Sequence, residues 1–344
     1  MNKNYFKYEE EFHLENGEYL DGFQLAYHTF GKRNSDDSNI VWVYHAISAN
    51  SDVLEWWPGL FGADKLYDPQ NYFIICVNTL CSPYGSTSPP DESFPLVSIR
   101  DVVKSQLLLA DALQISHIHT CIGGSFGGNQ ALEFSYQFHG QIDHLILMVS
   151  TFRESAYSIA THEAQRIAMK ADSTFGQRGG GQEGMKAARA FALINYRTHD
   201  AFVEQQTDFE EKIDQFKAAS YIQYQGDKFV DRFDSLCYYY LTKCLDTFHF
   251  SRGRGNLKKA LQAIKMPTLV LGIDSDILIP TRFQKQLASL IPNAIYEEID
   301  SDFGHDGFLV ETDKIKKKIL NFYIFANQSI ERLNRQKTIL QAPI

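Results

Sequence analysis

Apolar residues follow two patterns along the chain, and each pattern predicts a different kind of element. Continuous apolar runs at 40–44 and 72–77 are typical of strands buried on both faces, and the mixed but mainly apolar runs at 118–122, 144–149, 267–273 and 294–299 also have strand character. Elsewhere apolar positions recur with a helical period, as they do from 99 to about 113. Because strands alternate with helices, we expect an α/β fold with a doubly wound, mostly parallel sheet.

Further elements are expected near the two ends of the chain. Residues 11–30 alternate between apolar and polar positions, and the dipeptide Asn16-Gly17 readily adopts the backbone angles of a tight turn, so we expect a hairpin here. A last amphipathic helix is expected to begin near Thr312. Its apolar face would comprise Ile315, Ile319, Leu320 and Tyr323.

The pattern changes in the middle of the chain. From 152 to 258 the periodicity is helical, aromatic residues are dense and strand patterns are few. We therefore expect residues 1–151 and 259–327 to form one α/β core, with 152–258 inserted as a helical lid over the carboxyl edge of the sheet. The polar residues 328–344 are expected to form a surface tail.

Composition and charge narrow the class of protein. The 344 residues include 33 Lys and Arg against 42 Asp and Glu, and a net charge of −9 argues against a general nucleic-acid partner. The five cysteines have no CxxC spacing, so we expect buried free thiols in a reducing compartment and no metal site. The chain opens with no apolar signal segment and contains no run of membrane-spanning length, which favours a cytoplasmic location and no membrane partner.

The strongest candidate for chemistry is the segment GGSFGG at 123–128. It follows the apolar run 118–122 and precedes a helical pattern, which is the arrangement of a nucleophile elbow. A side chain at Gly123 or Gly127 would collide with the neighbouring strand or helix in such a sharp turn. The alternative is an ordinary strand–helix turn in which Ser125 only caps the helix.

Two loops after late strands supply the partners that a nucleophilic serine needs. A histidine must take the serine proton, and an acid must fix the tautomer of that histidine. His305 lies in a glycine-flanked loop after the run 294–299, and Asp274 and Asp276 follow the run 267–273. We favour His305 as the base and Asp276 as the acid, with Asp274 as a turn-forming residue.

An oxyanion hole would need two backbone N–H groups beside Ser125. One is expected from Phe126 at the start of the helix. The other is expected from Ile47, in the loop after the run 40–44. His45 and Asn50 in the same loop are interpreted as residues that brace it.

Several motifs together resemble the homoserine O-acetyltransferases, which have the α/β-hydrolase fold. They extend in order over nearly the whole chain: HAISANSD at 45–52, WWPGL at 56–60, YGST at 84–87, GGSFGG at 123–128, NYR at 195–197, RFD at 232–234, SDILIP at 275–280 and GHDGFL at 304–309. Family members commonly carry Leu-Thr in place of Ile47-Ser48 and Met in place of Phe126.

The resemblance implies a reaction and roles for named residues. The reaction is acetyl transfer from acetyl-CoA to the hydroxyl of L-homoserine, in methionine biosynthesis, by a ping-pong mechanism through acetylated Ser125. It implies Asp276 as the acid and His305 as the base, and it suggests that Arg197 and Asp306 hold the amino-acid substrate. Acetyl-CoA would be a co-substrate, with no permanently bound cofactor, and the enzyme would be a homodimer through lid helices.

Other functions use the same residues. A serine hydrolase or esterase needs only water as the acceptor, and a succinyl donor or a serine acceptor would define related transferases. Arg252 and Arg254 are candidates for contacts with CoA phosphates, but their segment SRGRG at 251–255 is equally consistent with a turn that carries solvated charges.

Overall fold

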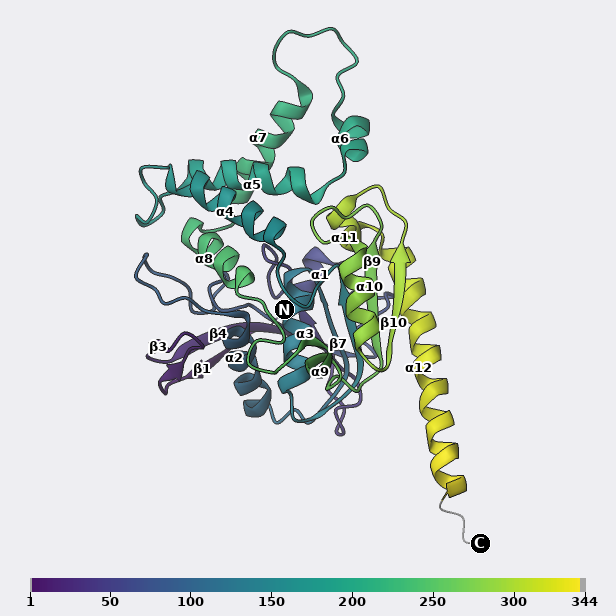
Figure 1. Ribbon diagram of the computed structural model, residues 1–344. Helices are drawn as coiled ribbons and strands as arrows, with labels where there is room; N and C mark the ends of the chain where they lie inside the picture. Colours follow the sequence, from purple (N-terminus) through teal and green to yellow (C-terminus); the bar gives the residue numbers. More distant parts are fainter. Residues whose placement is uncertain (1, 341–344) are drawn as a thin grey trace.

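An eight-stranded sheet runs through the molecule in the order β1-β4-β6-β5-β7-β8-β9-β10 (Figure 1). The computed structural model describes the backbone of residues 2–340 and the side chains of residues 3–328. The strands of the sheet are β1 (Asn2–Tyr8), β4 (Phe23–Phe30), β5 (Ile40–Tyr44), β6 (Phe73–Val77), β7 (His117–Gly124), β8 (Gln141–Met148), β9 (Thr268–Ile273) and β10 (Ala294–Ile299). From β6 to β10 all neighbours are parallel, whereas β4 pairs antiparallel with both β1 and β6. The predicted doubly wound, mostly parallel sheet is therefore confirmed.

Helices cover both faces of this sheet. The helices are α1 (Val53–Trp56), α2 (Ile99–Ala112), α3 (Phe126–Gln137), α4 (Ala156–Lys170), α5 (Gln182–Tyr196), α6 (His199–Gln206), α7 (Lys217–Val230), α8 (Ser235–Asp246), α9 (Leu257–Leu261), α10 (Thr281–Leu290), α11 (Gly307–Val310) and α12 (Thr312–Leu340). In β5, Trp42 packs into the core beneath α2 and α3, while Val41 and Val43 pack into a second core with α12. Successive side chains of a strand point to opposite faces, so a strand covered on both sides reads as a continuous apolar run.

The expected hairpin over residues 11–30 is wrong, because the strand near Phe12 does not pair with the strand that begins at Phe23. The turn lies where Asn16-Gly17 predicts it, with Gly17 at φ +91°, but it joins only β2 (Phe12–His13) to β3 (Tyr19–Leu20). The longer strand β4 pairs with β1 instead. The edge strand β1 (Asn2–Tyr8) begins with three polar residues and is partly exposed, so it has no regular apolar pattern by which it could be identified as the partner.

The last helix differs from the expectation in two ways. It continues to Leu340, so the predicted tail from 328 is helical as far as that residue, and residues 341–344 lie outside the described part of the chain. The segment 328–340 lacks Gly and Pro and is rich in good helix formers, which explains the continuation. The buried face of the helix comprises Ile315, Ile319, Phe322 and Ala326. Leu320, which we placed on this face, is 43% exposed.

Helices α4 to α8 belong to the expected lid, residues 152–258, which we call the lid segment. They follow β8 and precede β9 in the chain and lie above the core in Figure 1, on the side of α1 and α11. Those two short helices follow the carboxyl ends of β5 and β10, so the lid segment covers this edge of the sheet. The expected boundary at 258 falls inside α9 (Leu257–Leu261), and the division into core and lid stays a prediction.

Candidate active site

Ser125 occupies a sharp turn between β7 and α3. Its φ is +56°, a left-handed conformation that non-glycine residues rarely adopt, and its N–H donates to Met148 O at 2.9 Å. A Cβ on Gly123 would lie 2.3 Å from Gly127 O, and one on Gly127 would lie 2.2 Å from Tyr44 O. Both glycines are therefore required by the close approach of the strand, the turn and the helix, as the sequence predicted.

The structure brings Ser125, His305 and Asp276 into one hydrogen-bonded series. His305 Nε2 lies 2.7 Å from Ser125 Oγ, and His305 Nδ1 lies 2.7 Å from Asp276 Oδ2. If Nδ1 carries the proton and donates it to the carboxylate, Nε2 is free to accept the serine proton. This is the geometry in which a serine hydroxyl becomes a nucleophile.

The two aspartates of the β9 loop have different partners. Asp276 is fully buried, and its Oδ1 accepts from the N–H groups of Leu278 and Ile279, both at 2.9 Å. Its other oxygen is thereby aimed at His305. Asp274 instead accepts from Ser301 N at 3.1 Å, which holds the loops after β9 and β10 together. Of the two aspartates, only Asp276 contacts His305, and its role as the acid stays a prediction.

The surroundings of His305 favour its charged form. Burial alone would lower the pKa of this imidazole, but the charge and hydrogen bond of Asp276, together with nearby Asp306 and Glu154, raise the pKa above its ordinary value. A base of this kind is neutral only above its raised pKa, and the imidazolium formed during proton transfer is stabilised by the same carboxylate. The contact between Asp276 and His305 therefore favours transient protonation of His305 during a reaction.

The loop after β5 is held rigidly beside Ser125. His45 Nδ1 lies 2.8 Å from Ala46 O, and His45 Nε2 accepts from Thr79 N at 3.1 Å. Burial lowers the pKa of His45 to about 4, so this side chain is neutral and acts as a brace, as expected. Ile47 is buried and lines the pocket described next. The use of its N–H together with that of Phe126 as an oxyanion hole stays a prediction.

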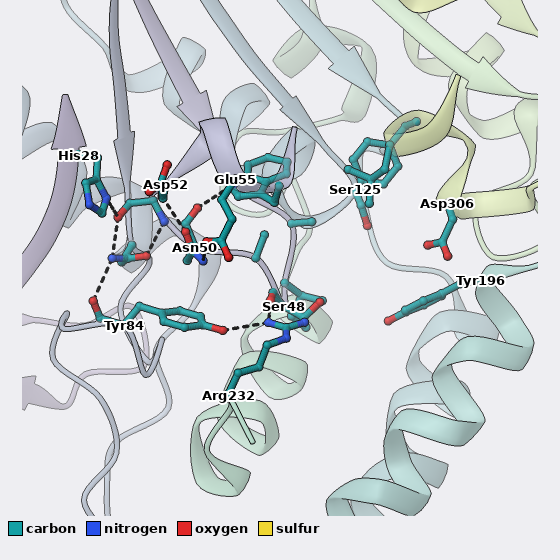
Figure 2. A pocket seen from close by; sticks show the side chains of 18 of the residues that line it. His28, Ser48, Asn50, Asp52, Glu55, Tyr84, Ser125, Tyr196, Arg232 and Asp306 are labelled. Atoms are coloured by element: carbon teal, nitrogen blue, oxygen red, sulfur yellow. Dashed lines mark hydrogen bonds between the residues drawn. The ribbon is translucent and has the colours of Figure 1, made fainter. Parts of the chain in front are cut away.

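A pocket of about 620 Å³ opens in front of Ser125. Figure 2 shows Ser125, Tyr196 and Asp306 on one side of it and His28 and Asp52 on the other. Its charged lining residues have both signs: Lys3, Arg189 and Arg232, and Asp52, Glu55 and Asp306. The pocket can therefore accept a ligand that carries both positive and negative groups.

The two expected substrate anchors lie together. Arg197 Nε is 3.3 Å from Asp306 Oδ2, so in this structure the two side chains form an ion pair with each other. Asp306 lines the pocket, whereas Arg197 contacts Asp306 but does not itself line the pocket. The role of the pair in holding an amino acid stays a prediction, and it requires the ion pair to open or to share its charges with a ligand.

Two arginines of the lid segment that face the pocket were given no role from the sequence. Arg232 Nη1 donates to Ser48 O at 2.7 Å and to Tyr84 Oη at 2.9 Å, which joins the lid segment to the loops after β5 and β6 (Figure 2). Its motif RFD contributed to the resemblance without indicating this contact. Arg189 lies over the ring of Phe229, with its guanidinium carbon 5.1 Å from the centroid. Nothing in the sequence distinguishes it from any other helical arginine.

The two arginines considered for CoA phosphates are engaged elsewhere. Arg254 forms an ion pair with the fully buried Glu133, and Arg252 forms one with Glu15. Neither lines the pocket in front of Ser125. Arg254 is also largely buried, so the interpretation of its segment as a turn with solvated charges is wrong for this residue.

The described residues also bear on metals, membranes and thiols. Within residues 2–340, no three His, Cys, Asp or Glu side chains gather as metal ligands would. In the same part of the chain, no helix has the length and apolar character needed to cross a membrane. The five cysteines are buried free thiols, which confirms the expectation from their spacing.

Comparisons with known proteins extend over most of the chain. A family model described as the alpha/beta hydrolase fold matches residues 39–312. The chain is 37% identical over 339 residues to the homoserine O-acetyltransferase of Cyclobacterium marinum, which covers 95% of this chain and 97% of that relative. A crystal structure of homoserine O-acetyltransferase from Bacillus anthracis matches with a TM-score of 0.85 at 22% identity, over 93% of this chain and 97% of the other. A crystal structure of esterase E22 matches with a TM-score of 0.84 at 19% identity, over 93% and 99%. At these identities, the two structures show a shared fold.

Proposed function

Because the chain belongs to the homoserine O-acetyltransferase family, whose members are acyltransferases with the α/β-hydrolase fold, we propose that it transfers an acetyl group from acetyl-CoA to the hydroxyl of L-homoserine. The product, O-acetylhomoserine, would serve methionine biosynthesis in the cytoplasm. The observation that carries the proposal is the series Ser125–His305–Asp276, which opens into a pocket with charges of both signs. An amino acid carries both charges, whereas a simple ester need carry neither.

The first half-reaction acetylates Ser125. Its Oγ attacks the thioester carbonyl carbon while its proton passes to His305 Nε2. The tetrahedral intermediate then loses the C–S bond, and His305 gives the proton to the departing thiolate. Asp276 remains ionised throughout and stabilises the imidazolium. Acetyl-Ser125 and free CoA are the products of this half-reaction.

The second half-reaction transfers the acetyl group to the acceptor. His305 takes the proton of the homoserine hydroxyl, whose oxygen attacks the acetyl carbonyl carbon. The bond to Ser125 Oγ breaks, and His305 returns the proton to that oxygen. In both half-reactions the N–H groups of Ile47 and Phe126 would stabilise the negative oxygen, and one such donor contributes about 10²–10³-fold to the rate in related chemistry.

Arg197 and Asp306 would recognise the two ends of the acceptor. Asp306 follows the base directly in the chain and faces the pocket, so a substrate ammonium held there would place a hydroxyl near His305 only at one chain length. Arg197 can offer a fork of N–H donors to the carboxylate of the substrate. Arg197 and Asp306 form an ion pair with each other at 3.3 Å. A bound amino acid would replace this ion pair by two others, one between its carboxylate and Arg197 and one between its ammonium group and Asp306.

We also propose that a second copy of the chain covers part of the lid segment. Large apolar side chains are exposed on its surface: Ile167, Ile194, Phe209, Ile213 and Tyr224. Apolar side chains gathered on one segment are typical of a surface that is covered in an assembly. The homodimer expected from the family resemblance would use these helices.

Two measurements separate acetyl transfer from ester hydrolysis. Acetyl-CoA is incubated with a panel of hydroxy amino acids, and the products are identified by mass. The acetylation of Ser125 and its discharge to homoserine are then measured separately for Arg197→Ala and Asp306→Ala. We expect acceptor use to weaken by about 2–4 kcal/mol in both variants, because a charged partner is left unpaired. Acylation by acetyl-CoA should change much less.

The control is Arg178→Ala, which removes an exposed arginine of the lid segment that does not line the pocket. It should behave like the parent in both half-reactions. Variants that transfer acetyl to homoserine as well as the parent would refute the assignment of Arg197 and Asp306. A parent enzyme that hydrolyses acetyl-CoA faster than it acetylates homoserine would favour the esterase function.

A further inference from the structure

A second, very small cavity also reaches Ser125. Its volume is about 10 Å³, close to the space of one water molecule. Among the residues that the structure describes, Ser125 is the one that lines both this cavity and the large pocket. Phe126, at the start of α3, contributes to the small cavity, and Ile47 contributes to the large pocket. The hydroxyl of Ser125 therefore stands between a wide space and a narrow one.

The buried side chain of Glu154 forms part of the wall of the small cavity. Only 8% of this residue is exposed, and its Oε1 accepts from Asn129 Nδ2 at 3.0 Å. Its backbone N–H donates to Phe248 O at 3.0 Å, which fixes the start of the lid segment. The mechanism described above gives no chemical step to this carboxyl group, although it lies beside the nucleophile.

Glu154 also separates the small cavity from a larger one. A surface cavity of about 430 Å³ lies beyond it, and the two cavities share Glu154, Ser158, Leu278 and Ile279 as lining residues. The backbone N–H groups of Leu278 and Ile279 are bound to Asp276, so this part of the wall is held by the same carboxylate that orients His305. Space for a longer chain exists beyond the wall, but the wall closes it off from Ser125.

A thioester bound for attack must place three groups around its carbonyl carbon. The carbonyl oxygen would point to the N–H groups of Ile47 and Phe126, and the bulky thiol portion fits only the large pocket. The acyl chain must then occupy the small cavity, on the other side of Ser125. We propose that the small cavity is the acyl pocket and that the bulk of Glu154, with Leu278, restricts the transferred group to acetyl.

This inference rests on the proposed acyl transfer, but its test does not require CoA or homoserine. The probes are p-nitrophenyl acetate, propionate and butyrate, and the readout is the rate of acylation of Ser125, followed as the release of p-nitrophenol. A methylene that does not fit a closed pocket changes the rate by about 10–200-fold. We therefore expect the parent enzyme to lose about 10-fold or more for each added methylene.

Three variants locate the restriction. Glu154→Ala and Leu278→Ala each open the wall, and each should bring the butyrate rate to within about 10-fold of the acetate rate. Glu154→Gln keeps the size and the hydrogen bond from Asn129, so it should keep the preference of the parent. Glu163→Ala, which removes an exposed glutamate on α4 away from the small cavity, is the control and should also keep it.

The outcomes are distinct. A parent enzyme that is acylated by butyrate as fast as by acetate would overturn the proposal. The proposal would also be overturned if Leu278→Ala and, where it folds, Glu154→Ala both kept the preference of the parent for acetate. It would be overturned as well if Glu154→Gln lost that preference. Failure to acetylate homoserine would refute the proposed function instead, because the p-nitrophenyl esters report on the acyl pocket whatever the natural acceptor is.

Discussion

Asp276→Asn is the substitution for which the structure gives the most detailed expectation. Asp276 uses one oxygen for His305 and the other for two backbone N–H groups. An asparagine can keep its oxygen toward the two backbone donors, but its NH₂ group then faces His305 Nδ1. His305 must accept there and carry its proton on Nε2, so it can no longer accept the proton of Ser125.

The opposite orientation of the asparagine is also costly. Its oxygen could accept from His305, but its NH₂ group would then face the two N–H groups that Asp276 now satisfies. Each buried donor left without an acceptor costs about 1–3 kcal/mol, so the first orientation is preferred. With the wrong tautomer we expect acylation to slow by about 10⁴-fold, the size of the loss when the aspartate of a serine protease triad is replaced in this way.

The assay is the acylation rate of Ser125 with p-nitrophenyl acetate, measured across pH. In the parent, activity should fall as pH falls through the raised pKa of His305, because only the neutral imidazole accepts a proton. Asp276→Asn removes the main charge that raises this pKa, so any remaining activity should persist to lower pH. The control is Asp274→Asn, which should stay near the parent rate because Asp274 contacts Ser301 instead. A loss below 10-fold in Asp276→Asn, or an equal loss in Asp274→Asn, would show that Asp276 does not set the tautomer of His305.

Three further expectations concern stability and assembly. Gly127→Ala should lower the free energy of unfolding by about 1–3 kcal/mol, seen as a lower denaturation midpoint, because the new Cβ would meet Tyr44 O at 2.2 Å. Burial lowers the pKa of His45 and of His119 to about 4, so below pH 6.5 these groups bind protons in the unfolded chain before they do so in the folded protein. The free energy of unfolding should therefore be full above pH 6.5 and fall as pH drops toward 4, by about 3 kcal/mol for His45. A urea midpoint that stays constant over this range would contradict the expectation. Light scattering at micromolar concentration should give twice the mass of one chain, and replacing the exposed Ile167 by Asp should reduce it to the monomer if the lid segment forms the dimer.

Burial on both faces made most of the sheet predictable from the sequence. Every residue of β5 and of β9 is buried; β5 is a continuous apolar run, and β9 is apolar apart from Thr268 and Gly272. In contrast, β1 lies at the edge, where one face meets solvent and its polar residues leave no such run. The pairing of β4 with β1 therefore depended on contacts that a local pattern does not record.

In the candidate site, too, some residues could be predicted from the sequence and others could not. Ser125, Asp276 and His305 could be predicted because each lies at a turn after a recognisable strand, and parallel strands bring those ends together. Asp276 was only preferred over Asp274 from the sequence, since both lie in one loop, and the coordinates show which of the two contacts His305. Glu154 was not singled out, because no motif marks it, and its place beside Ser125 depends on a contact with Asn129 of α3 that a local pattern does not record.

In the proposed mechanism, Ser125 carries the acetyl group between donor and acceptor. Its direct test is the intact mass of the protein after rapid mixing with acetyl-CoA alone, followed by addition of L-homoserine. We expect one acetyl group on Ser125 in the first step and its loss in the second, with O-acetylhomoserine formed in equal amount. Ser125→Ala should gain no acetyl group and should lose about 10⁴-fold or more in rate. Formation of O-acetylhomoserine only when both substrates are present, with no acetylated protein at any time, would contradict an acetyl-Ser125 intermediate.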